Sequence, residues 1–261
     1  MALRVLVTRP ARQAADWVKR LRDAGIDAVA LPLIAIDAAP DIGAVQRAWA
    51  DLAAMRLAVF VSPNAAECFI AARPAGATWP AATLAAAVGP GTSRVLRDFG
   101  LGEDRIVEPQ ADSPQFDSEA LWQRLRALDW RGSKVLIVRG DGGREWLADT
   151  LRAHGAEVGA VCAYRRSLPR FDPAQRGLLA AARAAPHAHL WFFSSSEAID
   201  NLDAIAGPRA DWTRACALAT HPRIAARAQR SGFGNVVPSR PDLDAVRACI
   251  QSLRDRHPFQ S

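Results

Sequence analysis

Lysine, tyrosine and methionine are scarce in this chain of 261 residues. Tyr164 is its one tyrosine, and Lys19 and Lys134 are its lysines. No apolar run reaches the roughly 18–20 residues that cross a bilayer. The first ten residues also lack the basic, apolar and small-residue sections of a secretory signal. We therefore expect a cytoplasmic protein without a membrane-spanning segment.

Cysteine pairs with metal-binding spacing are also missing. Cys68, Cys162, Cys216 and Cys249 stand far apart, which disfavours both a zinc site and a disulfide framework. His187 and His189 have no third ligand nearby. We therefore expect no metal. Arg139 to Arg144 resembles a phosphate loop but has neither the GxGxxG nor the GK[ST] spacing, so nucleotide binding is disfavoured.

The charge is positive and carried by arginine: 33 basic residues outnumber 27 acidic ones, a formal net charge of +6. A GC-rich genome explains such a bias, and so does a need for guanidinium groups that bind carboxylates or phosphates. Net charge alone permits nucleic acid or a small polyanion as partner. The chain lacks the clustered basic face or aromatic platform of nucleic-acid binders, so we expect no nucleic acid.

Short aliphatic runs alternate with helical stretches, a pattern typical of α/β proteins with parallel sheets. The expected strands are 3–8, 27–36 (broken by Pro32), 57–61, 84–88, 105–109, 134–140, 157–164, 188–193, 215–219 and 235–237. The expected helices are 12–24, 41–54, 118–128, 144–154, 174–184, 196–205 and 222–231, two more that end near 72 and 99, and a last one from 241.

The two halves of the sequence are weak copies of one unit. Val5-Leu6-Val7-Thr8-Arg9 matches Val135-Leu136-Ile137-Val138-Arg139 at an offset of 130, and Phe60-Val61-Ser62 matches Phe192-Phe193-Ser194 at 132. We therefore predict two similar α/β lobes, each a parallel sheet of about five strands flanked by helices. A cleft between two such lobes is the expected ligand site.

Each expected strand-to-helix turn is polar or rich in glycine. Such residues cap helices, and turns at the carboxyl ends of parallel strands also line the ligand site of open α/β sheets, where helix N-termini attract anions. As a set they favour a ligand with several carboxylates. The turns are Thr8-Arg9-Pro10, Ser62-Pro63-Asn64, Gly89-Pro90-Gly91-Thr92, Arg139 to Arg144, Ser194 to Glu197 and Thr220-His221-Pro222-Arg223.

Several blocks resemble the uroporphyrinogen-III synthase family, in order along nearly the whole chain. The most specific is Val135 to Arg166, VLIVRGDGGREWLADTLRAHGAEVGAVCAYRR; the others are 5–10, 60–69, 86–96, 117–122, 192–202 and 219–233. The resemblance implies a cytosolic lyase of tetrapyrrole (haem) biosynthesis without metal or organic cofactor. Its substrate would be hydroxymethylbilane, a linear tetrapyrrole with eight carboxylates.

The implied reaction removes the ring A hydroxyl as water and leaves an azafulvene cation. Ring D then attacks to form a spiro-pyrrolenine, which fragments and recombines so that ring D is inverted in uroporphyrinogen III. The uncatalysed reaction closes the ring without inversion, so the enzyme has to hold the chain folded. The hydroxyl needs general-acid help to leave.

The resemblance also implies the domain organisation and the site. A discontinuous lobe, 1–36 and 168–261, and a continuous lobe, 37–167, are joined by a two-strand hinge near 33–39 and 164–170. Tyr164 matches the family's tyrosine that assists departure of the hydroxyl, and we expect its ring at a lobe edge rather than deep inside. The expected substrate-binding residues are Arg9, Ser62, Asn64, Thr92, Arg139, Gly140, Ser194, Ser195 and Thr220.

One turn departs from the family pattern, because Thr220-His221-Pro222-Arg223 stands where many members carry a GPTT-like sequence. The contacts expected there are therefore less well defined. A different class of function also stays open at this point: a non-catalytic two-lobed binding module for a small anion, since fold does not fix function. We expect a monomer in either case.

Overall fold

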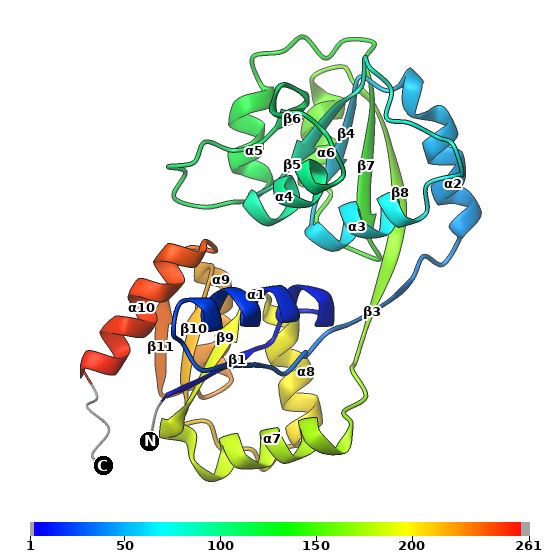
Figure 1. Ribbon diagram of the computed structural model, residues 1–261. Helices are drawn as coiled ribbons and strands as arrows, with labels where there is room; N and C mark the ends of the chain where they lie inside the picture. Colours follow the sequence, from blue (N-terminus) through cyan, green and yellow to red (C-terminus); the bar gives the residue numbers. More distant parts are fainter. Residues whose placement is uncertain (1–2, 257–261) are drawn as a thin grey trace. The chain divides into compact units, whose positions relative to one another are not determined.

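The computed structural model describes residues 3–256, in which the chain forms two compact units (Figure 1). Unit 1 comprises Met1–Ala35 and Ser167–Ser261, and unit 2 comprises Ile36–Arg166. Residues 1–2 and 257–261 of the expected discontinuous lobe lie outside the described residues. Within residues 3–256, no helix has the length and apolar character needed to span a membrane.

Unit 1 is a five-stranded parallel sheet, in the order β11-β10-β9-β1-β2. On one face, Val5 and Phe192 pack against Trp17 of α1 and Ile250 of α10. The strands are β1 Arg4–Val7, β2 Ala28–Ala30, β9 His189–Phe193, β10 Cys216–Ala219 and β11 Asn235–Pro238. The helices are α1 Ala11–Asp23, α7 Pro173–Ala184, α8 Ser196–Ala206, α9 Pro222–Arg230 and α10 Leu243–Arg256, with a 3-10 turn at Pro186–Ala188.

Unit 2 is a six-stranded sheet, in the order β3-β8-β7-β4-β5-β6, with parallel pairing from β8 to β6. Successive residues of β4 point to opposite faces: Ala58 and Phe60 enter one core, and Leu57 and Val59 the other. The strands are β3 Ala35–Ala38, β4 Leu57–Phe60, β5 Leu84–Ala87, β6 Ile106–Val107, β7 Lys134–Gly140 and β8 Glu157–Ser167. The helices are α2 Ile42–Ala50, α3 Pro63–Ala71, α4 Pro90–Asp98, α5 Ser118–Leu125 and α6 Trp146–Ala153, with 3-10 turns at Asp51–Ala54 and Glu103–Arg105.

The two sheets share one topology, which agrees with the repeat in the sequence. The offset of 130 places β1 on β7, and the offset of 132 places β9 on β4. The strand order β2-β1-β9-β10-β11 then corresponds to β8-β7-β4-β5-β6. Thr8 and Arg9 in unit 1 therefore correspond to Val138 and Arg139 in unit 2, and Ser194 corresponds to Ser62.

Several expected elements end a few residues earlier or later in the structure, and three of these differences have a clear physical reason. The run 27–36 splits into β2 and β3 around Pro32, which has no N–H to donate. The helix expected at 41–54 ends at Ala50 and tightens into the 3-10 turn. The strand expected at 157–164 continues to Ser167, because β8 lies between β7 and β3 and so has a neighbour on each side.

Close backbone packing in unit 1 requires a glycine at position 234. A β-carbon on Gly234 would stand 1.8 Å from the carbonyl oxygen of Thr213. We therefore expect Gly234→Ala to lower the free energy of unfolding by about 2 kcal/mol or more. The matched control is Gly177→Ala in α7, where nothing lies within 4 Å, and which should add about 0.5–1 kcal/mol. Urea unfolding of both variants tests this, and equal midpoints would contradict it.

Candidate active site

The helix that follows β4 begins with a polar turn at the carboxyl edge of the unit 2 sheet. Ser62 is the N-cap of α3, and its Oγ accepts a hydrogen bond from the Ala65 amide at 3.1 Å. Pro63 occupies the first helical position, where no amide donor is needed. This cap fixes the Ser62 hydroxyl at the end of β4, beside a helix N-terminus that attracts negative charge.

A β-bulge in the neighbouring strand β8 turns Tyr164 into the core of unit 2. Arg139 pairs with Cys162, but the next residue, Gly140, pairs with Tyr164, so that Ala163 is an extra residue on β8. Bulges of this kind redirect a side chain. Ala163 and Tyr164 consequently both join the same core, and the Tyr164 side chain is 0% exposed. The expectation of a ring at the lobe edge is therefore wrong: it relied on the place of Tyr164 at the end of the strand that leads into the hinge, and the bulge turns the ring inward.

Two side chains hold the buried phenol. Its Oη lies 3.1 Å from Ser62 Oγ, and Arg166 Nη2 donates to it at 2.9 Å. Arg166 was not foreseen as a site residue, although it lies two positions after Tyr164 and therefore on the same side of an extended strand. The structure thus brings Tyr164 and Ser62 together, two of the expected site residues, and adds a guanidinium to them.

The loop after β7 is hydrogen-bonded to β8 beside the same tyrosine. The Asp141 amide donates to the Tyr164 carbonyl at 3.1 Å, and the Asp141 carboxylate accepts from the Arg166 amide at 3.1 Å. This loop therefore has a structural role, which is to hold the end of β8 through Asp141. Asp141 fixes the backbone on both sides of Arg165.

Ion pairs hold the arginines of this loop. Arg139 pairs with Glu145, and Arg144 Nη2 donates to Glu119 at 2.7 Å. The hydrogen bond to Glu119 raises the pKa of the Arg144 guanidinium above its usual value. A substrate carboxylate that binds Arg139 has to compete with Glu145.

The other expected residues of unit 2 are less accessible. Asn64 and Thr92 are buried at 8% and 2% exposure. Both lie in the first turns of their helices, α3 and α4. Their side chains are therefore not freely exposed at this edge.

The corresponding edge of unit 1 follows the adjacent strands β1, β9 and β10. The Arg9 guanidinium lies 4.9 Å from the Trp17 ring centroid and 5.6 Å from that of Phe192, a cation–π arrangement that orients it. Ser195 is the N-cap of α8, and Ser194 precedes it. Thr220 precedes His221, which caps α9 by accepting from the Arg223 amide. The ring nitrogen of His221 thus takes the capping role that serine, threonine, asparagine and aspartate side chains commonly have.

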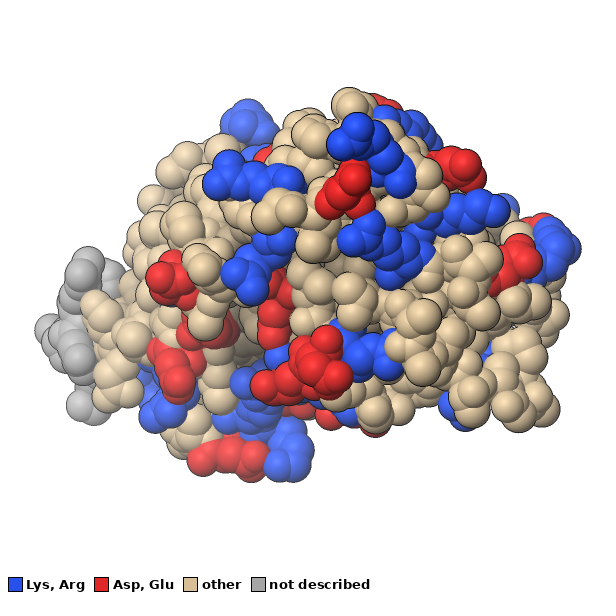
Figure 2. Space-filling model, turned by 90° about the horizontal axis from the view of Figure 1, so that it is seen from above, with Lys and Arg blue, Asp and Glu red and all other residues tan. Residues whose placement is uncertain are grey.

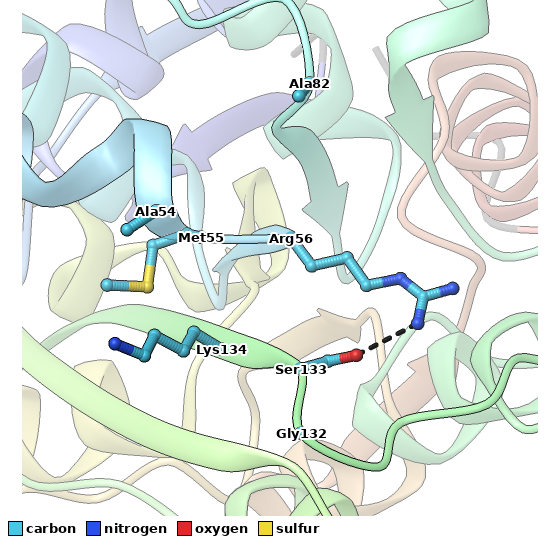
Figure 3. Close-up of a pocket in the computed structure, with 7 residues that line it drawn as sticks. All are labelled: Ala54, Met55, Arg56, Ala82, Gly132, Ser133 and Lys134. Carbon is cyan, nitrogen blue, oxygen red and sulfur yellow. Dashed lines mark hydrogen bonds between the residues drawn. The ribbon is translucent and has the colours of Figure 1, made fainter.

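The opposite, amino edge of the unit 2 sheet carries a cavity of about 450 Å³. Arg56 and Lys134 line it, but Figure 3 shows their charged ends at opposite ends of the lining. Arg56 instead donates to Ser133 Oγ at 3.0 Å. No site residue foreseen in the sequence lies in this cavity, and its cations do not converge on one ligand.

Acidic and basic side chains alternate over the surface seen in Figure 2. Pairs such as Arg152 with Asp149 and Arg131 with Asp129 balance individual arginine charges locally, and the net excess of basic residues remains. Within residues 3–256, no cluster of three or more histidine, cysteine, aspartate or glutamate side chains could hold a metal ion.

Fold and site together define an α/β protein of two repeated sheets, whose carboxyl edges combine hydroxyl groups with anion-attracting helix ends. The family model described as uroporphyrinogen-III synthase HemD matches residues 15–248. The uroporphyrinogen-III synthase of Salmonella typhimurium is 29% identical over 257 residues, 95% of this chain and 99% of the relative. A putative uroporphyrinogen-III synthase of Methanothermobacter thermautotrophicus is 30% identical over 208 residues, 78% of each chain.

Solved structures show the same fold. A mutant uroporphyrinogen III synthase of Thermus thermophilus superimposes with a TM-score of 0.57 at 19% identity and covers 98% of this chain and 100% of the other. The Helicobacter pylori enzyme gives 0.56 at 16% identity, covering 97% and 100%. The chain belongs to the uroporphyrinogen-III synthase family, which consists of lyases of tetrapyrrole biosynthesis. The alternative of a non-catalytic binding module finds no support.

Gly140 leaves no room for a larger residue beside the Tyr164 ring. A β-carbon there would lie 2.8 Å from Tyr164 Cζ and 3.1 Å from both Cε atoms. We expect Gly140→Ala to displace the phenol, to cost about 1–3 kcal/mol of stability and to lower turnover at least tenfold. Gly159→Ala on β8, with nothing within 4 Å, is the matched control. Full turnover in Gly140→Ala would show that the ring position does not matter.

Proposed function

We propose that this chain converts hydroxymethylbilane to uroporphyrinogen III, with loss of water and inversion of ring D. The observation that carries the proposal is the hydroxyl pair of Tyr164 and Ser62, held beside Arg166 at a sheet edge in a chain of this family. Loss of the ring A hydroxyl needs a proton donor, and this pair supplies one. The remaining steps need no nucleophile from the protein.

The substrate's eight carboxylates match the polar turns at the carboxyl edges. Helix N-termini at α3, α4, α8 and α9 offer main-chain amides, which bind anions without a basic side chain. Arg9 is oriented by its two aromatic neighbours, and Arg139 becomes available when it leaves Glu145. The proposed set is completed by Ser62, Asn64, Thr92, Gly140, Ser194, Ser195 and Thr220.

These contacts serve mainly to hold the bilane in one conformation. An unfolded bilane closes its ring without inverting ring D, so product identity depends on geometry as well as on rate. Many main-chain amides would share the binding of the carboxylates. A single side-chain hydrogen bond adds about 0.5–1.5 kcal/mol to it. We further propose a monomeric, cytoplasmic enzyme that uses no metal or organic cofactor and does not bind nucleic acid.

The assay supplies freshly prepared hydroxymethylbilane to the purified chain and identifies the uroporphyrin isomer after oxidation. We expect the type III isomer as the main product, at the same rate with and without a chelator. A parallel incubation without protein measures the spontaneous type I product. Type I product alone above this blank, or activity lost to the chelator, would contradict the proposal.

A further inference from the structure

The buried phenol of Tyr164 is hydrogen-bonded to two groups of different chemistry. Among residues 3–256, its oxygen is hydrogen-bonded to Ser62 Oγ and to Arg166 Nη2. A guanidinium carries donors only, so Arg166 donates and the phenol oxygen accepts. The phenol's own proton therefore has one acceptor within reach in this part of the chain, which is Ser62 Oγ.

The energetic cost of the reverse hydrogen bond, from Ser62 to the phenol, explains why the phenol is the donor. If Ser62 donated to the phenol, the phenol proton would be left without an acceptor around a side chain that is 0% exposed. An unsatisfied buried donor costs about 1–3 kcal/mol. Ser62 Oγ can receive the proton, because a hydroxyl has two acceptor positions and the Ala65 amide fills one of them.

This direction determines where the Ser62 hydroxyl can donate its own proton. With both of its acceptor positions filled, by the Ala65 amide and by the phenol, its own proton is left for an outside acceptor. Ser62 is half-buried, whereas Tyr164 is enclosed. Ser62 is therefore the member of the pair that can touch a substrate.

We propose that Ser62 is the catalytic residue that protonates the departing hydroxyl, with Tyr164 as the proton source behind it and Arg166 as the positioning residue that sets the direction of the relay. This inference rests on the proposed function. It replaces the direct contact between Tyr164 and substrate that the family resemblance implies.

Atoms and charges balance in this step. The bond between the ring A methylene carbon and the hydroxyl oxygen breaks, and the oxygen keeps the electron pair. That oxygen takes the Ser62 proton and leaves as water, while Ser62 Oγ takes the Tyr164 proton. The substrate becomes the azafulvene cation, and Tyr164 becomes a phenolate that the Arg166 guanidinium stabilises. The proton released when the macrocycle closes returns through Ser62 to Tyr164.

The repeat within the chain shows that this arrangement belongs to one unit. Ser194 corresponds to Ser62 in unit 1, but the position that corresponds to Tyr164 is Leu33 once the extra residue Ala163 is allowed for, and Leu33 is apolar and buried. Unit 1 therefore has the serine of the turn without a phenol behind it. The relay is an addition to the common scaffold rather than a consequence of it.

A double-mutant cycle tests the relay through the rate of type III formation. We expect Tyr164→Phe and Ser62→Ala each to lower kcat about 100-fold, and the double variant to fall within about threefold of the worse single variant, because both belong to one unit. Independent contacts would instead multiply to about 10⁴-fold. We expect Arg166→Met to lower kcat at least tenfold with KM within twofold, and Arg166→Lys to recover part of the loss.

Two controls separate the relay from loss of the helix cap. Ser62→Gly removes the hydroxyl but costs the cap only a few tenths of a kcal/mol, and it should match Ser62→Ala in kcat. Asp41→Ala removes the cap of α2, where the Asp41 carboxylate accepts from the Ala44 amide, and should leave kcat unchanged.

The outcomes distinguish this inference from the proposed function. Multiplicative losses, near-full kcat in Ser62→Gly, or a rise in KM alone for Arg166→Met would overturn the relay while type III product from the wild type upholds the function. Absence of type III product from the wild-type chain would overturn both.

Discussion

A buried phenol has to give its proton to an acceptor, and the active edge of unit 2 is organised around this requirement. The bulge at Ala163 brings Tyr164 into the core, and Gly140 leaves room for its ring. The α3 cap holds Ser62 Oγ where the proton can go, and Asp141 fixes the backbone at Arg166. Each feature alone is an ordinary element of an α/β fold; together they place three polar groups in a single hydrogen-bonded chain.

A comparison of the two repeated units distinguishes the features that both share from those found in unit 2 alone. Both sheets end in polar turns and helix N-termini, which suit a ligand with many carboxylates. Unit 2 places a phenol behind the serine of its turn and unit 1 does not, since Tyr164 is the chain's one tyrosine. The proposed proton donor thus lies in one of the two copies of this fold.

The sequence predicted the fold well because parallel α/β units leave strong patterns: buried β-branched strands, capping turns and an internal repeat. It also indicated Ser62 and Tyr164, through the turn and the family resemblance. The bulge could not be predicted, since one extra residue in β8 leaves no signal in composition or periodicity. The burial of Tyr164 and the hydrogen bond from Arg166 to its phenol depend on that local geometry and were not predicted either.

The direction of the phenol's hydrogen bond is the central claim, and the single tyrosine makes it measurable. Tyrosine labelled with ¹³C at Cζ gives one NMR signal from the whole protein. We expect this signal to move in Ser62→Gly, which removes the acceptor, and in Arg166→Met, which removes the donor, but to stay in place in Asp41→Ala. Loss of an acceptor should move the signal away from the phenolate position, so a signal that is unchanged in Ser62→Gly, or that moves toward the phenolate position, would contradict a phenol that donates to Ser62.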